Sequence, residues 1–351
     1  MKIDNVEQKS RQALLDCFQQ VPFLDPPQEV TALEDNGVDF VFRIVNRQEQ
    51  TPYLLAAEVK DSGQPRFIQQ GVNQLKLYQQ ENEEITYSVL LAPYISEQSA
   101  QICKENGIGY VDLAGNCYLS FATVFIEKEG NPNPYTQDRE LKSIFYPKSE
   151  RILRVLLNAG PREWLTEELA EEAGVSLGQV SNVRKYLDNQ GWLDPDSSRL
   201  RVGKPLEMLN VWARNYSFRK NEIIEYYSLG NPAETEQRLT EAGQTLGLTL
   251  SFTGFSGGSR YASMVRYQRV MAYLEDGFDR LESTADLKPV SSGANVLLLK
   301  PYDRGVFYQS RPIDEMPVVS PVQAYLDLAS YRGRGEEAAQ ALLDQEIRKL
   351  W

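Results

Sequence analysis

Two apolar stretches near the N-terminus decide the fold of the first part of the chain: VDFVFRIV at residues 38–45 and YLLAAEVK at residues 53–60. Both are rich in β-branched and aromatic residues and are separated by a short polar run, which predicts a β-hairpin. A turn centred between Gln48 and Glu49 places Asp39 directly opposite Glu58. Lys60 shares their face, because side chains two apart on a strand point the same way.

The neighbouring segments alternate between helical and extended patterns. We expect helices at 6–18, 67–79 and 97–106, a central strand at 87–92, and edge strands at 110–113 and 117–126 on either side of a turn. Gln74 and Tyr78 are four residues apart and therefore face the same side of their helix. Residues 1–148 are thus predicted to form an α/β domain.

The hairpin brings two carboxylates and an ammonium group together, and the composition limits the chemistry they can serve. The chain contains no histidine, which excludes a Ser-His-Asp triad and His-ligated zinc. Mg²⁺ needs only one or two carboxylates, supplemented by waters and phosphate oxygens. Asp39 and Glu58 are therefore candidate Mg²⁺ ligands, and Lys60 is a candidate stabiliser of developing negative charge.

An Asp on one strand, Glu-x-Lys on the next and Gln-x-x-x-Tyr on the following helix resemble the PD-(D/E)XK, restriction-endonuclease-like superfamily. The Pro that gives this motif its name is absent, since Val38 precedes Asp39. The resemblance implies a metal-dependent nuclease with Asp39 and Glu58 as ligands, Lys60 as the catalytic lysine, and Gln74 and Tyr78 beside the site. The alternative is that Glu58 and Lys60 form an exposed ion pair and the helix residues are plain surface.

The middle segment, residues 149–205, has the pattern of a winged helix-turn-helix. A helix at 149–159 ends at Gly160, a short helix at 167–173 is capped by Thr166 and ends at Gly174, and Ser176 opens a third helix that runs to about Leu187. Residues 191–193 and 200–202 are expected to form a two-stranded wing. The segment resembles winged-helix regulators of the MarR and IclR type.

The third helix is predicted to turn Val180, Val183 and Leu187 inward and a polar face outward. A recognition helix reads bases with such side chains, and the wing adds cations for phosphate contacts. The DNA-contacting residues predicted on this basis are Ser176, Gln179, Ser181, Asn182, Arg184, Lys185, Arg199 and Arg201. A winged helix used for protein contacts is the alternative.

Residues 206–351 are expected to form an α+β domain. A Gly-rich turn at 253–259 follows a strand, as in nucleotidyltransferases, but Glu275 and Asp276 are adjacent and would point to opposite sheet faces, which argues against a live transferase. GANV at 293–296, VSPVQAYLDL at 319–328 and RGEEAA at 334–339 resemble the C-terminal region of the AbiEi family. Over residues 149–351 this resemblance implies an antitoxin of a type IV toxin–antitoxin system that represses its own operon through a winged helix.

The composition sets the wider context. With a net charge of −12 the chain carries no uniformly basic coat, so any nucleic-acid contact must be local. Three scattered cysteines and the lack of an apolar signal or membrane segment favour a cytoplasmic location. The leading hypothesis is a regulator or antitoxin that binds double-stranded DNA, with a cognate toxin and a second copy of the chain (a homodimer) as candidate partners. The alternatives are a Mg²⁺-dependent nuclease targeted by the winged helix and a non-catalytic adaptor.

Overall fold

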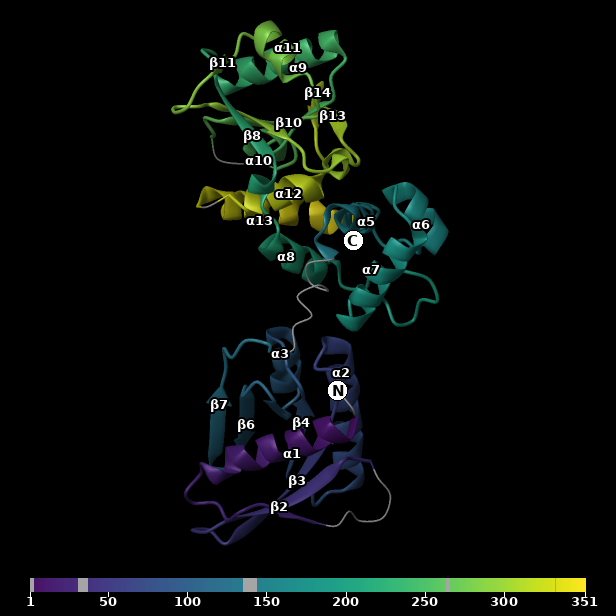
Figure 1. Ribbon diagram of the computed structural model, residues 1–351, viewed down its shortest axis with the longest axis vertical. Helices are drawn as coiled ribbons and strands as arrows, with labels where there is room; N and C mark the ends of the chain where they lie inside the picture. The colour runs from purple at the N-terminus through teal and green to yellow at the C-terminus, as the bar shows by residue number, and fades with distance from the viewer. Residues whose placement is uncertain (1–2, 31–36, 135–143, 263–265, 332) are drawn as a thin grey trace. The chain divides into compact units, whose positions relative to one another are not determined.

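The computed structural model describes residues 3–30, 37–134, 144–262, 266–331 and 333–351 (Figure 1). The chain divides into two compact units, one formed by residues 1–138 and 188–191 and the other by residues 139–187 and 192–351. The first unit corresponds to the predicted α/β domain. The second contains both segments that the sequence suggested as separate domains, 149–205 and 206–351.

The first unit is built on a seven-stranded sheet whose strands lie in chain order. They are β1 (Gln28–Glu29), β2 (Phe40–Asn46), β3 (Thr51–Val59), β4 (Tyr87–Ala92), β5 (Gly109–Asp112), β6 (Cys117–Phe121) and β7 (Val124–Lys128). The predicted hairpin register is confirmed, since Phe40 pairs with Ala57 and Asn46 with Thr51. The three strands β3, β4 and β5 are parallel, and the other pairs are antiparallel.

The prediction of edge strands beyond residue 109 is wrong for β5 and β6. Both are paired on two sides, and of the described strands beyond residue 109 in this sheet, β7 alone lies at an edge. The stretch predicted as one strand at 117–126 turns back at Ala122, whose φ of 46° lies in the left-handed region. All four residues of β5 are buried, which is typical of an interior strand.

Helices cover both faces of this sheet. On one face lies α1 (Ile3–Gln19), which crosses the strands in Figure 1 and buries Leu14 and Phe18. The other face carries α2 (Pro65–Glu81) and α3 (Glu97–Glu105). Ala56 of β3 belongs to this second face, and alternation along the strand places Glu58 and Lys60 there too, next to α2.

The second unit contains another mixed seven-stranded sheet, with strand order β11-β8-β12-β10-β9-β14-β13. Its strands are β8 (Glu222–Tyr227), β9 (Leu250–Phe252), β10 (Val270–Leu274), β11 (Lys288–Pro289), β12 (Val296–Lys300), β13 (Arg311–Ile313) and β14 (Met316–Val318). Two helices, α9 (Pro232–Leu246) and α11 (Phe278–Thr284), share a core with one face of the sheet.

The other face of this sheet packs against a helical layer. Its members are α8 (Pro205–Asn215), α10 (Gly254–Gly258), α12 (Pro321–Ala329) and α13 (Arg334–Gln345), with short 3₁₀ turns at Phe218–Lys220, Arg304–Phe307 and Ile347–Leu350. Helix α12 begins with Pro321 after Ser320, whose hydroxyl accepts a hydrogen bond from the Gln323 backbone N–H.

The segment predicted as a helix-turn-helix contains the helices α5 (Pro147–Asn158), α6 (Thr166–Ala173) and α7 (Leu177–Asn189). Gly174 ends α6 in the left-handed conformation, as expected, with φ 62°. Thr166 is not the cap; Leu165 occupies that position, and its backbone N–H donates to the Glu168 carboxylate. The wing consists of short bridges, Leu193 to Val202 and Trp164 to Leu200, the second of which adds a segment that the sequence did not indicate.

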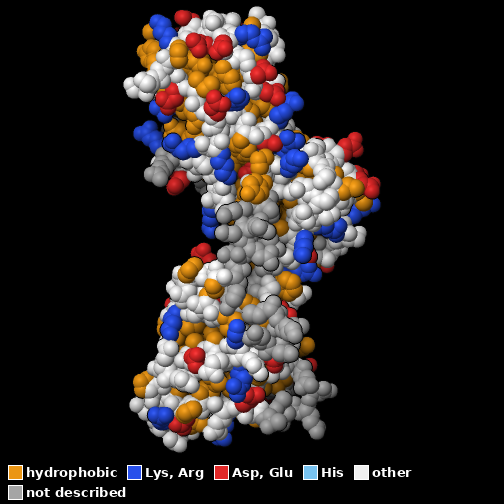
Figure 2. Space-filling model, in the orientation of Figure 1, with side chains coloured by type: hydrophobic (Ala, Val, Ile, Leu, Met, Phe, Trp, Pro, Cys, Tyr) orange, Lys and Arg blue, Asp and Glu red, His pale blue; other side chains and the backbone are white. Residues whose placement is uncertain are grey.

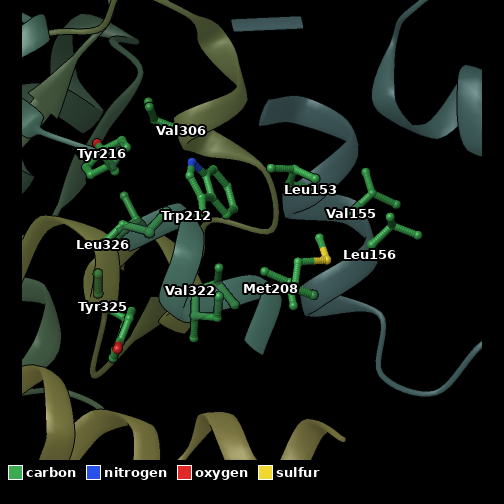
Figure 3. Packing of buried hydrophobic residues seen from close by; sticks show 14 of the residues in the cluster. Leu153, Val155, Leu156, Met208, Trp212, Tyr216, Val306, Val322, Tyr325 and Leu326 are labelled. Atoms are coloured by element: carbon green, nitrogen blue, oxygen red, sulfur yellow. The ribbon is translucent and has the colours of Figure 1, made fainter. Parts of the chain in front are cut away.

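A single hydrophobic core joins this helix-turn-helix to the sheet domain. Figure 3 shows Leu153 and Leu156 of α5 gathered with Met208 and Trp212 of α8 and with Leu326 of α12. Trp212 and Leu326 are fully buried. The segment predicted as a winged helix therefore belongs to one compact unit with the C-terminal sheet, rather than being a module on a linker.

Candidate functional site

The first candidate site is the acidic cluster that the sequence placed at the carboxyl end of β3. Lys60 Nζ donates to Glu58 Oε1 at 2.7 Å and to Gln74 Oε1 of α2 at 2.9 Å. Asp39 Oδ2 accepts from the Val59 backbone N–H at 2.7 Å, across the hairpin. The structure thus brings together Asp39, Glu58, Lys60 and Gln74, at the sheet end where open α/β folds bind ligands.

Two glycines allow the helix to approach this cluster closely. A Cβ at Gly71 of α2 would lie 2.9 Å from Lys60 Cε and 2.5 Å from a Leu90 methyl carbon. A Cβ at Gly37 would lie 2.5 Å from the Tyr78 ring, and the Gly37 carbonyl accepts from Gln74 Nε2 at 2.8 Å. Tyr78 therefore packs beside the segment that leads into Asp39, and Gln74 links that segment to Lys60.

The electrostatics of Glu58 set it apart from an exposed ion-pair partner. Glu58 is 6% exposed, and its Oε2 atom is buried without a hydrogen-bond partner in the part of the chain that the structure describes. Burial raises the pKa of Glu58, an effect that the hydrogen bond from Lys60 opposes and the Asp39 charge reinforces. A buried carboxylate oxygen without a partner is costly unless something binds it.

These residues fit a divalent cation in donor type. No three His, Cys, Asp or Glu side chains gather anywhere among the described residues, so a metal here would rest on Asp39 and Glu58 alone. Two carboxylates suffice for Mg²⁺ when waters and phosphate oxygens complete its shell. Lys60 already neutralises part of the Glu58 charge, and the same geometry also serves as a buried ion pair.

The second candidate site is the outer face of α7. The predicted inward stripe is confirmed, since Val180, Val183 and Leu187 are each at most 2% exposed. Ser181, Asn182, Arg184 and Lys185 are exposed, and no described residue forms a hydrogen bond or ion pair with their side chains. On the face drawn in Figure 2, acidic and basic side chains are interspersed, so positive charge is available only locally.

Other residues predicted to contact DNA are engaged within the protein. Gln179 Nε2 donates to Ser149 Oγ of α5 at 2.7 Å, and Ser176 Oγ accepts from the Gln179 backbone N–H at 3.3 Å. Arg201 lies 3.5 Å from Asp194, whereas the exposed Arg199 has no carboxylate partner among the described residues. The free polar surface is therefore narrower than the sequence suggested and centres on the middle of α7.

A buried polar network that the sequence analysis missed ties α5 to the sheet domain. Asp327 of α12 is fully buried and accepts from Tyr216 at 2.7 Å, Tyr273 at 2.9 Å and Gln323 at 3.1 Å, and also from Thr253. Burial raises the pKa of Asp327, and these four hydrogen bonds oppose the rise.

The same network continues into α5. Arg154 Nε donates to Gln323 Oε1 at 2.9 Å, and the guanidinium lies 3.6 Å from Glu150 and 5.1 Å from the Trp212 ring centroid. Trp212 and Tyr302 both donate to the Glu150 carboxylate. Glu150 and Arg154 are both fully buried. In the sequence, Glu150 and Arg154 look like an ordinary surface ion pair four residues apart on a helix. The only sign of their burial is the high proportion of apolar residues around them in α5.

The comparisons with known proteins concern the second unit. Residues 201–348 match the family described as a transcriptional regulator, the AbiEi antitoxin of type IV toxin–antitoxin systems. The matched stretch begins in the wing, so it is shorter than the resemblance that the sequence suggested from residue 149. No curated protein and no solved structure matches the chain. None of the described helices is long and apolar enough to cross a membrane.

Proposed function

We infer that this protein is a transcriptional regulator and antitoxin of the AbiEi type that binds double-stranded DNA and represses its own operon. The observation that carries the inference is the uncommitted polar face of α7, in the same compact unit as the AbiEi-like stretch. Antitoxins of this family description act with a toxin, so a cognate toxin is the expected protein partner.

The chemistry of α7 suits the major groove of DNA. Asn182 offers an amide that pairs bidentately with adenine, while Arg184 and Lys185 supply cations for phosphates or guanine. Arg199 extends the positive charge into the wing. Since few cations are free, we expect modest non-specific affinity and a correspondingly shallow salt dependence.

Fluorescence anisotropy with the DNA upstream of the protein's own gene tests this function. Asn182→Ala should weaken specific binding by about 1–3 kcal/mol. Lys185→Ala should weaken binding to every sequence and lower the salt slope by about one. Gln237→Ala, an exposed position on α9 at the opposite sheet face, is the matched control. If both α7 variants bind DNA with unchanged affinity, α7 is not the helix that contacts the bases.

The partnerless Oε2 of Glu58 favours a second candidate function, a Mg²⁺-dependent nuclease in the first unit. Asp39 and Glu58 would hold the metal, which would activate water and polarise the phosphodiester. Lys60 would stabilise negative charge in the transition state, and Gln74 would position Lys60 through their hydrogen bond, with Tyr78 packed alongside.

Cleavage of labelled DNA in Mg²⁺ or Mn²⁺ tests the second candidate. Lys60→Ala should abolish cleavage while leaving metal binding largely intact, because its proposed role lies in the transition state. Arg66→Ala, an exposed cation on α2, is the control for a general loss of positive charge. A wild-type protein that binds no Mn²⁺ in calorimetric titration, with or without DNA, contradicts the nuclease and leaves the regulator untouched.

A further inference from the structure

A cavity of about 410 Å³ opens in the second unit between the start of β10, helix α10 and the turn from α12 to α13. The residues that matter for its chemistry are Arg266, Arg269 and Arg334 together with Phe255, Tyr267 and Tyr331. None of the described residues that line it is acidic. Three arginines and three aromatic rings therefore share one small cavity, well separated in sequence from α7.

The aromatic wall of the cavity is held in place by contacts outside it. The Tyr331 ring stacks on Phe218 with centroids 5.8 Å apart and meets the edge of Phe255 at 5.7 Å. The Tyr267 hydroxyl donates to Glu236 at 2.7 Å. A Cβ at Gly335 would lie 2.4 Å from the Leu328 carbonyl oxygen, so glycine is required for α13 to begin this close to α12 and keep Arg334 beside Tyr331.

The three arginines lack the carboxylate partners that several other arginines of this unit have. Arg151 pairs with Asp303, Arg260 with Glu236 and Arg348 with Asp344. By contrast, Arg266 and Arg334 have no hydrogen-bond or ion-pair partner among the described residues, and Arg269 donates only to the neutral Tyr331 hydroxyl, at 3.3 Å. Like charges gathered without a counter-ion repel one another, and a bound anion would relieve that repulsion.

We propose that this cavity binds a mononucleotide. Guanidinium groups recognise phosphate through paired, charge-assisted hydrogen bonds, and an arginine cluster suits a chain of phosphates. Aromatic rings stack on nucleobases with little preference for sequence. The volume is that of a small-ligand site, and a nucleotide combines a polyanionic end with a flat ring. The proposal uses no residue of the DNA-reading surface and goes beyond the regulator function.

Isothermal titration calorimetry on the full-length protein tests the proposal, with ATP, GTP, CTP and UTP as separate ligands. At least one should bind with one site per chain. Arg266→Gln, Arg269→Gln and Arg334→Gln should each weaken that binding at least tenfold. Arg280→Gln, an exposed arginine on α11 at the opposite sheet face, should leave it unchanged. The melting temperature of each variant shows that it is folded.

Two further ligands separate a nucleotide site from other anion sites. Inorganic triphosphate should bind more weakly than the best nucleotide, and Phe255→Leu should lower nucleotide affinity without altering triphosphate affinity. Saturating dT₁₂ should not prevent nucleotide binding. The proposal fails if no nucleoside triphosphate binds at millimolar concentration, if the arginine variants bind like wild type, if triphosphate binds as tightly as the nucleotides, or if dT₁₂ displaces them.

Discussion

Each unit of the protein contains a cluster of charged side chains at the junction of a sheet and a helix, but the two clusters are completed differently. In the first unit, Glu58 keeps one oxygen without a partner and Lys60 is 20% exposed at its side chain. In the second unit, Asp327 accepts four hydrogen bonds and is wholly buried. The first cluster can still accept a ligand, whereas the Asp327 carboxylate of the second receives all its hydrogen bonds from the protein. In this second cluster, Arg154 Nη1 and Nη2 are buried without a hydrogen-bond partner among the described residues.

This difference separates two uses of buried charge. A closed network fixes the parts that it joins, because any rearrangement would strand polar groups away from water. Glu150 and Arg154 come from the helix-turn-helix, while Gln323 and Asp327 come from the sheet domain. In the first cluster, the electrostatic cost of the buried carboxylate is reduced only when a cation or substrate binds. Four predictions test the comparison, from the largest expected effect to the smallest.

Removing Arg154 should produce the largest loss of stability. Arg154→Met leaves Glu150 buried without its cation, which typically costs about 3–5 kcal/mol. All four tryptophans, Trp164, Trp192, Trp212 and Trp351, belong to the second unit, so urea denaturation followed by tryptophan fluorescence reports on this unit alone. Arg348→Met, which breaks an exposed pair with Asp344, should cost less than about 1 kcal/mol. If Arg154→Met and Arg348→Met lower the free energy of unfolding equally, the proposed difference between the buried network and a surface ion pair is contradicted.

Divalent cations should stabilise the first unit. A ligand that binds only the native state adds about 2.7 kcal/mol at 100 times its Kd. Scanning calorimetry with and without Mn²⁺ should show this gain in wild type, and Asp39→Asn should remove much of it. The tryptophan-detected transition of the second unit provides the internal control. If Asp39→Asn responds to Mn²⁺ as wild type does, the open cluster is not the metal site.

Stability of the first unit should depend on pH through Glu58. Because burial raises the pKa of Glu58 above 4.5 in the folded state, the native protein holds this proton more tightly than the unfolded chain. The stability that this tighter proton binding adds to the folded state is therefore fully present below pH 4.5. It is lost as the pH rises through the raised pKa of Glu58. Glu58→Gln should flatten this slope in urea denaturation followed by circular dichroism. An unchanged slope would assign the pH dependence to other groups.

Arg201 should matter least for stability. Its pair with Asp194 is partly exposed, so Arg201→Ala should change the free energy of unfolding by less than about 1 kcal/mol. If the wing contacts phosphate, the same variant should still reduce the salt slope of DNA binding by about one. A larger loss in the free energy of unfolding, with no change in the salt slope, would indicate that Arg201 stabilises the fold and does not contact DNA.

The sequence predicted the elements that depend on local pattern. The hairpin register followed from two apolar strands and one polar turn, and the inward stripe of α7 followed from helical periodicity. It also brought Asp39, Glu58 and Lys60 to one place, because strand alternation and register determine which side chains share a face. The position of Gln74 beside them was implied only by the family resemblance. The assignment of this unit to the PD-(D/E)XK superfamily stays a prediction.

Features that depend on distant contacts were not predictable. Nothing local in Glu150 or Arg154 shows that Gln323 and Trp212 will surround them. Gln179 looked like a base-reading residue because its position on α7 is near the helix start, but its partner Ser149 lies 30 residues earlier. The strand order in the first unit likewise depended on pairing across the sheet, which hid the interior positions of β5 and β6.

The central claim is that the second unit reads DNA through the exposed face of α7. It is tested most directly by the affinity of the full-length protein for the duplex upstream of its own gene, compared with a shuffled duplex of the same composition at fixed salt. The account predicts at least about a thousandfold preference, as specific regulators show, and a preference weakened by about 1–3 kcal/mol in Asn182→Ala. Equal affinity for the two duplexes would contradict it.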